Sequence, residues 1–235
     1  MASEPTLLLI ADIGGYTRYM SSHRMSLAHA EVVSARLLES VVDAVPDFDL
    51  IEIEGDAAFL SHAADGPAPV DLTLRAARSM HRAFHREREY VAANLCPCRT
   101  CTKADDLKLK FVAHLGEVAT QTIRERRKLV GIDVIHVHRL LKNPVDLPEY
   151  VLLSEELYRS AHRDGVPPVR EVSQDLEGIG PVHSYCMDVA DLPGGTEPLP
   201  QPSLLGRVGK TLNVAGAGLP YMLGLRRGRR SAPAG

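Results

Sequence analysis

LLIADIGGYT, the segment from Leu8 to Thr17, places Asp12 at the end of an apolar strand and follows it with a glycine turn. Such a turn presents backbone N–H groups and one carboxylate above the strand end, which suits a metal-bound phosphate. Further along, LIEIEGDAAFL (Leu50 to Leu60) predicts two apolar strands that meet at a tight turn containing Asp56. Carboxylates at neighbouring strand ends are suitable oxygen ligands for Mg²⁺ or Mn²⁺. The alternative is that each aspartate only caps its turn.

The composition limits the class of protein. With 235 residues, of which 45% are hydrophobic, the chain can bury one good core. A formal net charge of −3 argues against a nucleic-acid binder, because neutralising phosphates requires a clustered basic excess. No N-terminal segment has the pattern of a signal peptide, and no apolar stretch of about 18 residues would span a bilayer. We therefore expect a cytoplasmic protein.

The spacing of apolar residues predicts the secondary structure. Between Leu27 and Val45, and again between Val70 and Val91, apolar residues recur every three or four positions, as on one buried face of a helix. Short apolar segments predict strands at 49–54, 57–62, 108–113, 150–153 and 182–187, and a helix is expected over 154–158. The resulting order βααββαβαβ predicts an α+β fold in which helices cover one face of a mainly antiparallel sheet.

The last part of the chain has a different composition. From residue 191 onward, prolines and glycines interrupt every regular pattern, and four arginines follow between Arg226 and Arg230. We therefore assign one domain to residues 1–190 and a linker with a basic, flexible tail to residues 191–235. The alternative for this tail is a weak contact with a membrane surface or a protein partner.

An insert at about residues 94–106 carries three closely spaced thiols, Cys96, Cys98 and Cys101. With a fourth nitrogen or sulfur ligand they could bind Zn²⁺, and Cys186, His85 and His114 are candidates for that ligand. The alternative is a reduced, redox-sensitive cluster in an exposed loop.

Four motifs together resemble the class III adenylate/guanylate cyclase homology domain, over about residues 6–189. The segments around Asp12 and Asp56 resemble its two metal motifs. LKFVAHLGEV (Leu109 to Val118) resembles the strand with its H-x-G signature, and GIDVIHVHRLL (Gly131 to Leu141) resembles the helix with its transition-state residues. The cysteine insert and HRLLKN (His138 to Asn143) resemble a divergent, actinobacterial-type branch of cyclase-like proteins.

This resemblance implies a ferredoxin-like core and a nucleoside triphosphate held by two Mg²⁺ or Mn²⁺ ions. Asp12 and Asp56 would be the metal ligands, and Arg139 would neutralise charge on the transferring phosphoryl group. The nucleotide would lie against the turn formed by Ile13, Gly14, Gly15, Tyr16 and Thr17, where the carbonyl of Ile13 is a further metal ligand. Because the family combines aspartates from one subunit with the arginine of the other, a head-to-tail homodimer is also implied.

The sequence also departs from the family pattern. Ile135 stands where the family has a ribose-orienting asparagine, and Ile179 where it has a triphosphate-binding lysine. Lys128 or Arg126 could replace that lysine. Glu52 matches the base-reading residue of guanylate-selective members, whereas Lys128, at the second base-reading position, matches neither class. The sequence therefore does not assign ATP or GTP.

Three functions are compatible with these residues. The first is a cyclase-like protein that binds a nucleoside triphosphate through metal ions, has weak or absent cyclase activity and serves in signalling or regulation. The second is an active adenylate or guanylate cyclase. The third is a scaffold without enzymatic activity that recruits a partner or a membrane. The retained Asp12, Asp56 and Arg139 favour the first two, and the two isoleucines favour the first.

Overall fold

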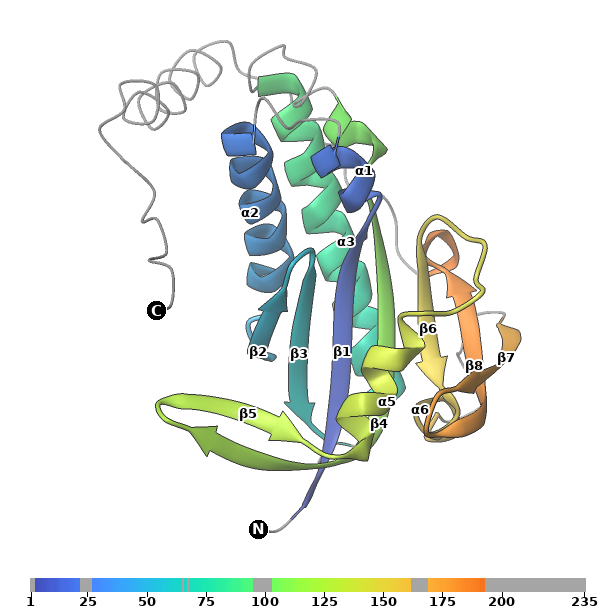
Figure 1. Cartoon of the computed structure of the whole chain (residues 1–235). Coiled ribbons are helices and arrows are strands. Elements are labelled where there is room, and N and C mark those ends of the chain that lie inside the picture. The colour runs from blue at the N-terminus through green and yellow to red at the C-terminus, as the bar shows by residue number, and fades with distance from the viewer. Residues whose placement is uncertain are drawn as a thin grey trace, which may run out of the picture.

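The computed structural model describes residues 3–21, 27–64, 66, 68–94, 103–161 and 169–192 (Figure 1). The strands are β1 (Glu4–Gly14), β2 (Asp49–Glu54), β3 (Ala57–Ala63), β4 (Lys108–Ile123), β5 (Arg126–Val130), β6 (Tyr150–Ser154), β7 (Arg170–Leu176) and β8 (Gly180–Asp188). The α-helices are α1 (Tyr16–Ser21), α2 (Leu27–Asp43), α3 (Pro69–Asn94), α5 (Ile132–Leu140) and α6 (Glu155–Arg159). Short 3₁₀ helices cover Lys103–Asp106 (η2) and Val189–Asp191 (η3).

One large sheet organises these elements. Its strand order is β2-β3-β1-β4-β6-β8-β7, and β5 pairs with the far half of β4. All neighbouring strands run antiparallel except β4 and β6, which are parallel. The predicted α+β class with a mainly antiparallel sheet is therefore confirmed.

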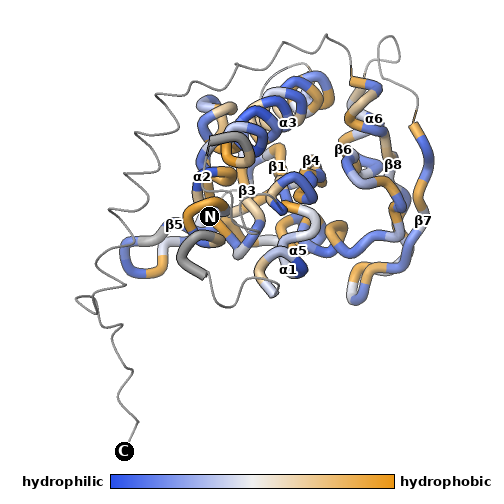
Figure 2. The backbone as a smooth tube through the Cα atoms, turned by 90° about the horizontal axis from the view of Figure 1, so that it is seen from above, coloured by the Kyte–Doolittle hydropathy of each residue, from blue (hydrophilic) through white to orange (hydrophobic). Residues whose placement is uncertain are grey.

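The central strand β1 is buried on both of its faces. Leu7, Leu9, Ala11 and Ile13 belong to one hydrophobic cluster, which α2 and α3 complete. Leu8 and Ile10 belong to a second cluster, to which α5 contributes Val137 and Leu140. Figure 2 shows α3 and α5 on opposite sides of β1 and β4. Helices therefore cover both faces of the sheet, and the expectation that they cover only one face is wrong. The reason is that β1 has apolar side chains on both sides, so each side must be packed against other apolar residues.

The predicted helix faces are confirmed where their side chains are described. Ala30, Val33, Leu37 and Val41 of α2 are buried, and Val70, Leu74, Ala77, Phe84 and Val91 of α3 are buried too. Two strands were not predicted. β5, with the sequence RRKLV, has no apolar alternation, and only Val172 and Leu176 are buried in β7. β5 forms because it pairs with β4, and β7 forms because it pairs with β8; neither has the alternating apolar residues that would predict a strand.

Several sequence-based expectations lie outside the described residues. They include the cysteine cluster at positions 96, 98 and 101 and nearly the whole segment 191–235. Among the described helices, none combines the length and apolar character needed to cross a bilayer.

Replacing Phe111 by Ala tests the importance of the central strands. The Phe111 side chain on β4 is fully buried in the cluster beneath α2 and α3, so Phe111→Ala should lower the free energy of unfolding by about 3–5 kcal/mol. Ile123→Ala, on an exposed position of the same strand, should change it by about 0.5 kcal/mol or less. Urea denaturation measures both, and equal losses would contradict this assignment of the core.

Candidate functional site

The ends of β1 and β3 bring Asp12 and Asp56 together. Asp12 pairs in register with Ala57 of β3, the residue directly after Asp56. The N–H of Ile13 donates a hydrogen bond to the Asp56 carbonyl at 3.0 Å, which ties the β2–β3 turn to the end of β1. Gly55 allows this tight turn because its φ is +66°, in the left-handed region that glycine tolerates. The two candidate metal ligands are thus neighbours in space.

A lysine that the motif comparison did not predict joins this pair. Lys110 of β4 pairs in register with Asp12, and its Nζ lies 2.9 Å from Asp12 Oδ2. Burial works against the charge of Lys110, but the hydrogen bond and the negative charge of Asp12 outweigh it and raise the lysine pKa. An ammonium group therefore stands where a metal ion bound to Asp12 would deliver its positive charge.

The surroundings of Asp56 disfavour its ionised form. Partial burial, and after it the negative charge of Asp12, raise the pKa of Asp56 above its usual value. One ammonium group faces two carboxylates, so the site has an excess of negative charge that a divalent cation would balance. The donors are carboxylate oxygens, the type preferred by Mg²⁺ and Mn²⁺, so the residues present fit such an ion.

The predicted nucleotide-binding turn leads directly away from this pair. Gly15 has φ +86° and turns the chain from β1 into α1, whose Thr17 is exposed. Beside it lies a mainly apolar groove of about 570 Å³, between α1, α2 and β2, with Tyr16, Leu50 and Ile53 among its lining residues. Glu52 on β2 and Lys128 on β5 are both exposed. The tip of the β4–β5 hairpin reaches β2, where Arg127 Nη2 lies 3.3 Å from Asp49 Oδ2.

Arg139 lies on α5, beside the β7–β8 turn. Its guanidinium packs against the β7–β8 turn, where a Cβ on Gly178 would lie 3.3 Å from Nη1. The preceding residue of α5, His138, reaches the β2–β3 turn that carries Asp56, where its Nε2 lies 3.1 Å from Glu54 Oε1. Nη1 of Arg139 is buried and has no hydrogen-bond partner among the described residues. Among the described residues, Arg139 has no ion pair with Asp12 or Asp56, and the only ion pair to these two carboxylates is that of Lys110 with Asp12.

The H-x-G motif builds a buried polar connection that sequence reasoning did not find. His114 Nδ1 lies 2.8 Å from Ser154 Oγ, and its Nε2 lies 2.9 Å from Asp133 Oδ1. The other oxygen of Asp133 accepts a hydrogen bond from the Glu117 N–H at 2.7 Å. Gly116 is required here because a Cβ would lie 2.3 Å from Asp133 Cγ. The connection fixes the start of α5, the helix that carries Arg139.

This Ser–His–Asp alignment is structural. Ser154 has no exposed surface, and its Oγ already accepts the Leu157 N–H as the N-cap of α6. A nucleophile must be reachable by a substrate, so Ser154 does not meet that condition. The H-x-G spacing was a visible signal, but the Asp133 and Ser154 partners come from other elements.

The three residues considered as a fourth zinc ligand, His85, His114 and Cys186, are each in an environment that does not depend on the cysteine cluster. His85 Nε2 lies 2.7 Å from Glu149 Oε1, and His114 is engaged as described above. Burial raises the pKa of the Cys186 thiol to about 11, which disfavours the thiolate that binds zinc. Because Cys96, Cys98 and Cys101 lie outside the described residues, their zinc site stays a prediction.

Comparisons with known proteins place the chain among relatives. A family model described as "Protein of unknown function (DUF2652)" matches residues 34–150. The uncharacterized protein Rv2561/Rv2562 of Mycobacterium tuberculosis is 35% identical over 196 residues, which cover 82% of this chain and 90% of that protein.

Solved structures of nucleotide cyclases share the fold. A bacterial light-regulated adenylyl cyclase has a TM-score of 0.60 at 10% identity, over 91% of this chain and 57% of that chain. The present chain thus spans little more than half the length of that cyclase. The guanylate cyclase domain of RhGC from Catenaria anguillulae, in complex with GTP, has a TM-score of 0.57 at 16% identity, over 79% of this chain and 97% of that domain.

Asp56→Asn should stabilise the protein at neutral pH when divalent metals are absent. Because folding raises the pKa of Asp56, its ionised form is less favourable in the folded than in the unfolded state, and stability is lost as pH rises from the unfolded pKa of 3.8 through the raised folded pKa. The melting temperature should therefore rise by a few degrees at about pH 7 and little at about pH 4. Asp49→Asn, on an exposed side chain, serves as the control, and a lower melting temperature for Asp56→Asn at neutral pH would contradict the assigned repulsion.

Gly116→Ala should separate β4 from the start of α5. The new Cβ would displace the Asp133 carboxylate from His114 and Glu117, at a cost of about 2–4 kcal/mol in the free energy of unfolding. Gly66→Ala is the matched control, since nothing lies within 4 Å of a Cβ there. Chemical denaturation compares the two, and an undiminished stability of Gly116→Ala would show that the connection does not hold α5.

Proposed function

Since the chain belongs to the same family as the mycobacterial protein Rv2561/Rv2562 and has a fold like that of nucleotide cyclase domains, we propose that it is a cyclase-like protein that binds a nucleoside triphosphate through divalent metal ions. In this proposal its cyclase activity is weak or absent, and binding serves a signalling or regulatory role. The observation that carries the proposal is the juxtaposition of Asp12 and Asp56 at adjoining strand ends, where a single lysine is paired with Asp12.

Metal binding would change the contacts of Lys110. Mg²⁺ or Mn²⁺ bound to Asp12 and Asp56 supplies the charge that lets a triphosphate approach these carboxylates. The ion would compete with Lys110 for Asp12, and the released ammonium group, at the same strand end, would be free to contact a phosphate oxygen. Such a contact could offset the lysine that is replaced by Ile179.

The rest of the nucleotide would lie along the glycine turn. Gly14 and Gly15 leave the backbone open to a phosphate, and Tyr16 lines the groove beside the turn. Glu52 is exposed on β2, where it can accept hydrogen bonds from a guanine edge. Lys128, also exposed, is the second residue proposed to contact the base. GTP is the nucleotide present in the Catenaria domain, and the choice between GTP and ATP in this chain is left to the binding experiment.

Weak catalysis is proposed because two polar contacts are replaced by aliphatic side chains. Ile135 is exposed on α5 and offers no hydrogen bond to a ribose, while Ile179 packs against the cluster beneath α5. Loss of one preorganised contact to transition-state charge commonly costs about 10²–10³ in rate. Losses within one site do not simply add, so we expect a slow enzyme or none.

A head-to-tail homodimer is part of the proposal. Arg139 packs against the β7–β8 turn, and among the described residues it has no ion pair with Asp12 or Asp56. A two-fold axis that brings α5 of one subunit over the strand ends of its partner would supply the arginine twice, in two equivalent sites. The proposal also retains the ferredoxin-like core, a domain over residues 1–190, a separate segment 191–235 and a cytoplasmic location.

An active cyclase is the second candidate. Its specific support is the buried Nη1 of Arg139, which lacks a hydrogen-bond partner among the described residues and so has bonding capacity left for a phosphate. In this candidate, the head-to-tail dimer brings that group to the metal site of the partner subunit.

Calorimetry with Mn²⁺ and non-hydrolysable GTP and ATP analogues tests the proposal. Metal-dependent binding is expected, and Asp12→Ala should weaken it by about 10-fold or more because a metal ligand is lost. Asp49→Ala on β2 should bind as the unchanged protein does. Binding that is independent of metal, or equal in Asp12→Ala, would contradict the assigned site. A Mn²⁺-supported turnover assay with GTP and ATP then separates the two candidates, since robust cyclic nucleotide formation that disappears in Asp12→Ala would establish the active cyclase.

A further inference from the structure

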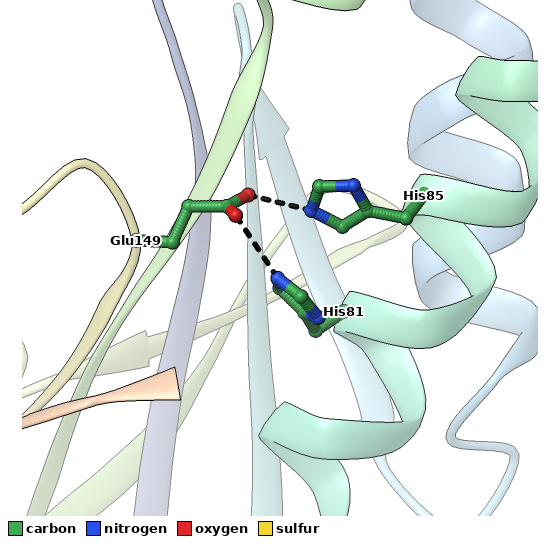
Figure 3. A group of neighbouring side chains, drawn as sticks. All are labelled: His81, His85 and Glu149. Carbon is green, nitrogen blue, oxygen red and sulfur yellow. Dashed lines mark hydrogen bonds and ion pairs between the residues drawn. The ribbon is translucent and has the colours of Figure 1, made fainter. Parts of the chain in front are cut away.

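Two histidines and a glutamate converge on the face of the sheet away from Asp12. His81 and His85 lie one turn apart on α3, and Glu149 lies directly before β6 (Figure 3). His81 Nε2 lies 3.2 Å from Glu149 Oε2, and His85 Nε2 lies 2.7 Å from Glu149 Oε1. One ligand atom from each of the three side chains lies within 4.8 Å of the other two. Residues distant in sequence therefore present three potential metal ligands to one point.

The surrounding backbone fixes the orientation of the carboxylate. The Leu109 N–H of β4 donates a hydrogen bond to Glu149 Oε1 at 2.9 Å, and the Val189 N–H donates to the Glu149 carbonyl at 3.4 Å. One further turn along α3, Arg88 donates to the Leu107 carbonyl at 2.8 Å. Metal-binding side chains commonly have such supporting hydrogen bonds, which hold the ligand atom in place. The glutamate is thus positioned by contacts outside the cluster itself.

The cluster is neither sealed nor fully open. The side chains of His81, His85 and Glu149 are 24%, 19% and 17% exposed. This partial exposure gives an ion a route to the site and leaves room for water as a further ligand. In a tetrahedral zinc site, with metal–ligand distances near 2.0–2.2 Å, ligand atoms lie about 3.3 Å apart. Small side-chain rotations would bring these three atoms to that spacing.

The donor types indicate the class of ion. Two imidazole nitrogens and one carboxylate suit Zn²⁺ and similar transition metals, whereas Mg²⁺ and Ca²⁺ prefer oxygen ligands alone. We propose that His81, His85 and Glu149 form a binding site for a zinc-type divalent transition metal, which links α3 to the beginnings of β4 and β6. Water completes the coordination. The site is separate from the Asp12 and Asp56 pair in donor chemistry and in position.

The two sites nevertheless adjoin the same part of β4. Lys110 pairs with Asp12 on one face, and the preceding residue, Leu109, donates to Glu149 on the other. A metal ion that fixes Glu149 would therefore also fix the strand residue next to the lysine of the nucleotide site. The zinc-type ion acts here as a brace, and it takes no part in the proposed nucleotide chemistry.

A second group of potential ligands is less suitable. One ligand atom each from His114, His136 and Glu156 lies within the same distance range. However, both ring nitrogens of His114 already have partners in Ser154 and Asp133, so metal binding there would break the connection that fixes α5. His136 provides a control for this alternative.

The test is a Co²⁺ and Zn²⁺ titration of the full chain carrying Cys96→Ser, Cys98→Ser and Cys101→Ser, which removes the thiol site predicted from sequence. One Co²⁺ per chain should bind at micromolar concentration with the visible spectrum of a low-coordinate nitrogen and oxygen site, and Zn²⁺ should displace it. His85→Gln and Glu149→Gln should each weaken Zn²⁺ binding by about 10–100-fold or more. Glu149→Gln keeps a side-chain oxygen for the Leu109 N–H, so its fold can be verified by circular dichroism before titration.

Two control variants show whether any loss of Zn²⁺ binding is specific to His81, His85 and Glu149. His183→Gln alters an exposed histidine paired with Glu171 at 2.8 Å, and His136→Gln alters the alternative group, so both should leave Zn²⁺ affinity unchanged. The proposal is overturned by no metal binding at micromolar concentration, by unchanged affinity in His85→Gln and Glu149→Gln, or by a loss confined to His136→Gln. Should a histidine or glutamate variant not fold, the chain that carries only the three Cys→Ser changes is measured alone. Its melting temperature must rise with Zn²⁺ concentration, and a constant melting temperature overturns the proposal.

Discussion

Burial of β1 on both faces is the constraint on which the other parts of this molecule depend. Because Leu7 to Ala11 have almost no exposed surface, the strand must be flanked by β3 and β4 and covered by α2 and α3 on one side and by α5 on the other. The first polar side chain after this apolar segment is that of Asp12. It emerges at the strand end with its position already fixed by two neighbouring strands, so a carboxylate is held there by core packing rather than by a flexible loop.

The same strand pairing determines the electrostatics of the candidate site. Antiparallel register places Lys110 beside Asp12, and the Ile13 N–H holds the Asp56 turn in place. In the chain without metal, the lysine balances only part of the negative charge, and the pKa of Asp56 rises as a result of burial and the neighbouring aspartate. A divalent cation would remove that imbalance. This is the physical reason for assigning metal binding to a site whose expected catalytic contacts are incomplete.

Sequence patterns predicted the parts of this arrangement that depend on local order. Apolar strands followed by Asp12 and Asp56, and the apolar faces of α2 and α3, were visible because each repeats along a short segment. The pairing of Lys110 with Asp12 was not predicted, because a lysine in an alternating strand has the pattern of a solvent-facing residue. His81, His85 and Glu149 were not grouped, since 64 residues separate His85 from Glu149 and only the sheet brings them together. The cover of the second face by α5 also follows from tertiary packing.

The central claim is that Asp12 and Asp56 jointly bind a divalent cation with a nucleotide. Anomalous diffraction from crystals grown with Mn²⁺ and a non-hydrolysable nucleoside triphosphate analogue tests it most directly. The account predicts a manganese peak between the two carboxylates, with the Lys110 ammonium group displaced from Asp12 and the triphosphate along the Gly14 and Gly15 turn. A Lys110 to Asp12 ion pair that persists with no manganese beside it, in crystals that contain the analogue, would contradict the account.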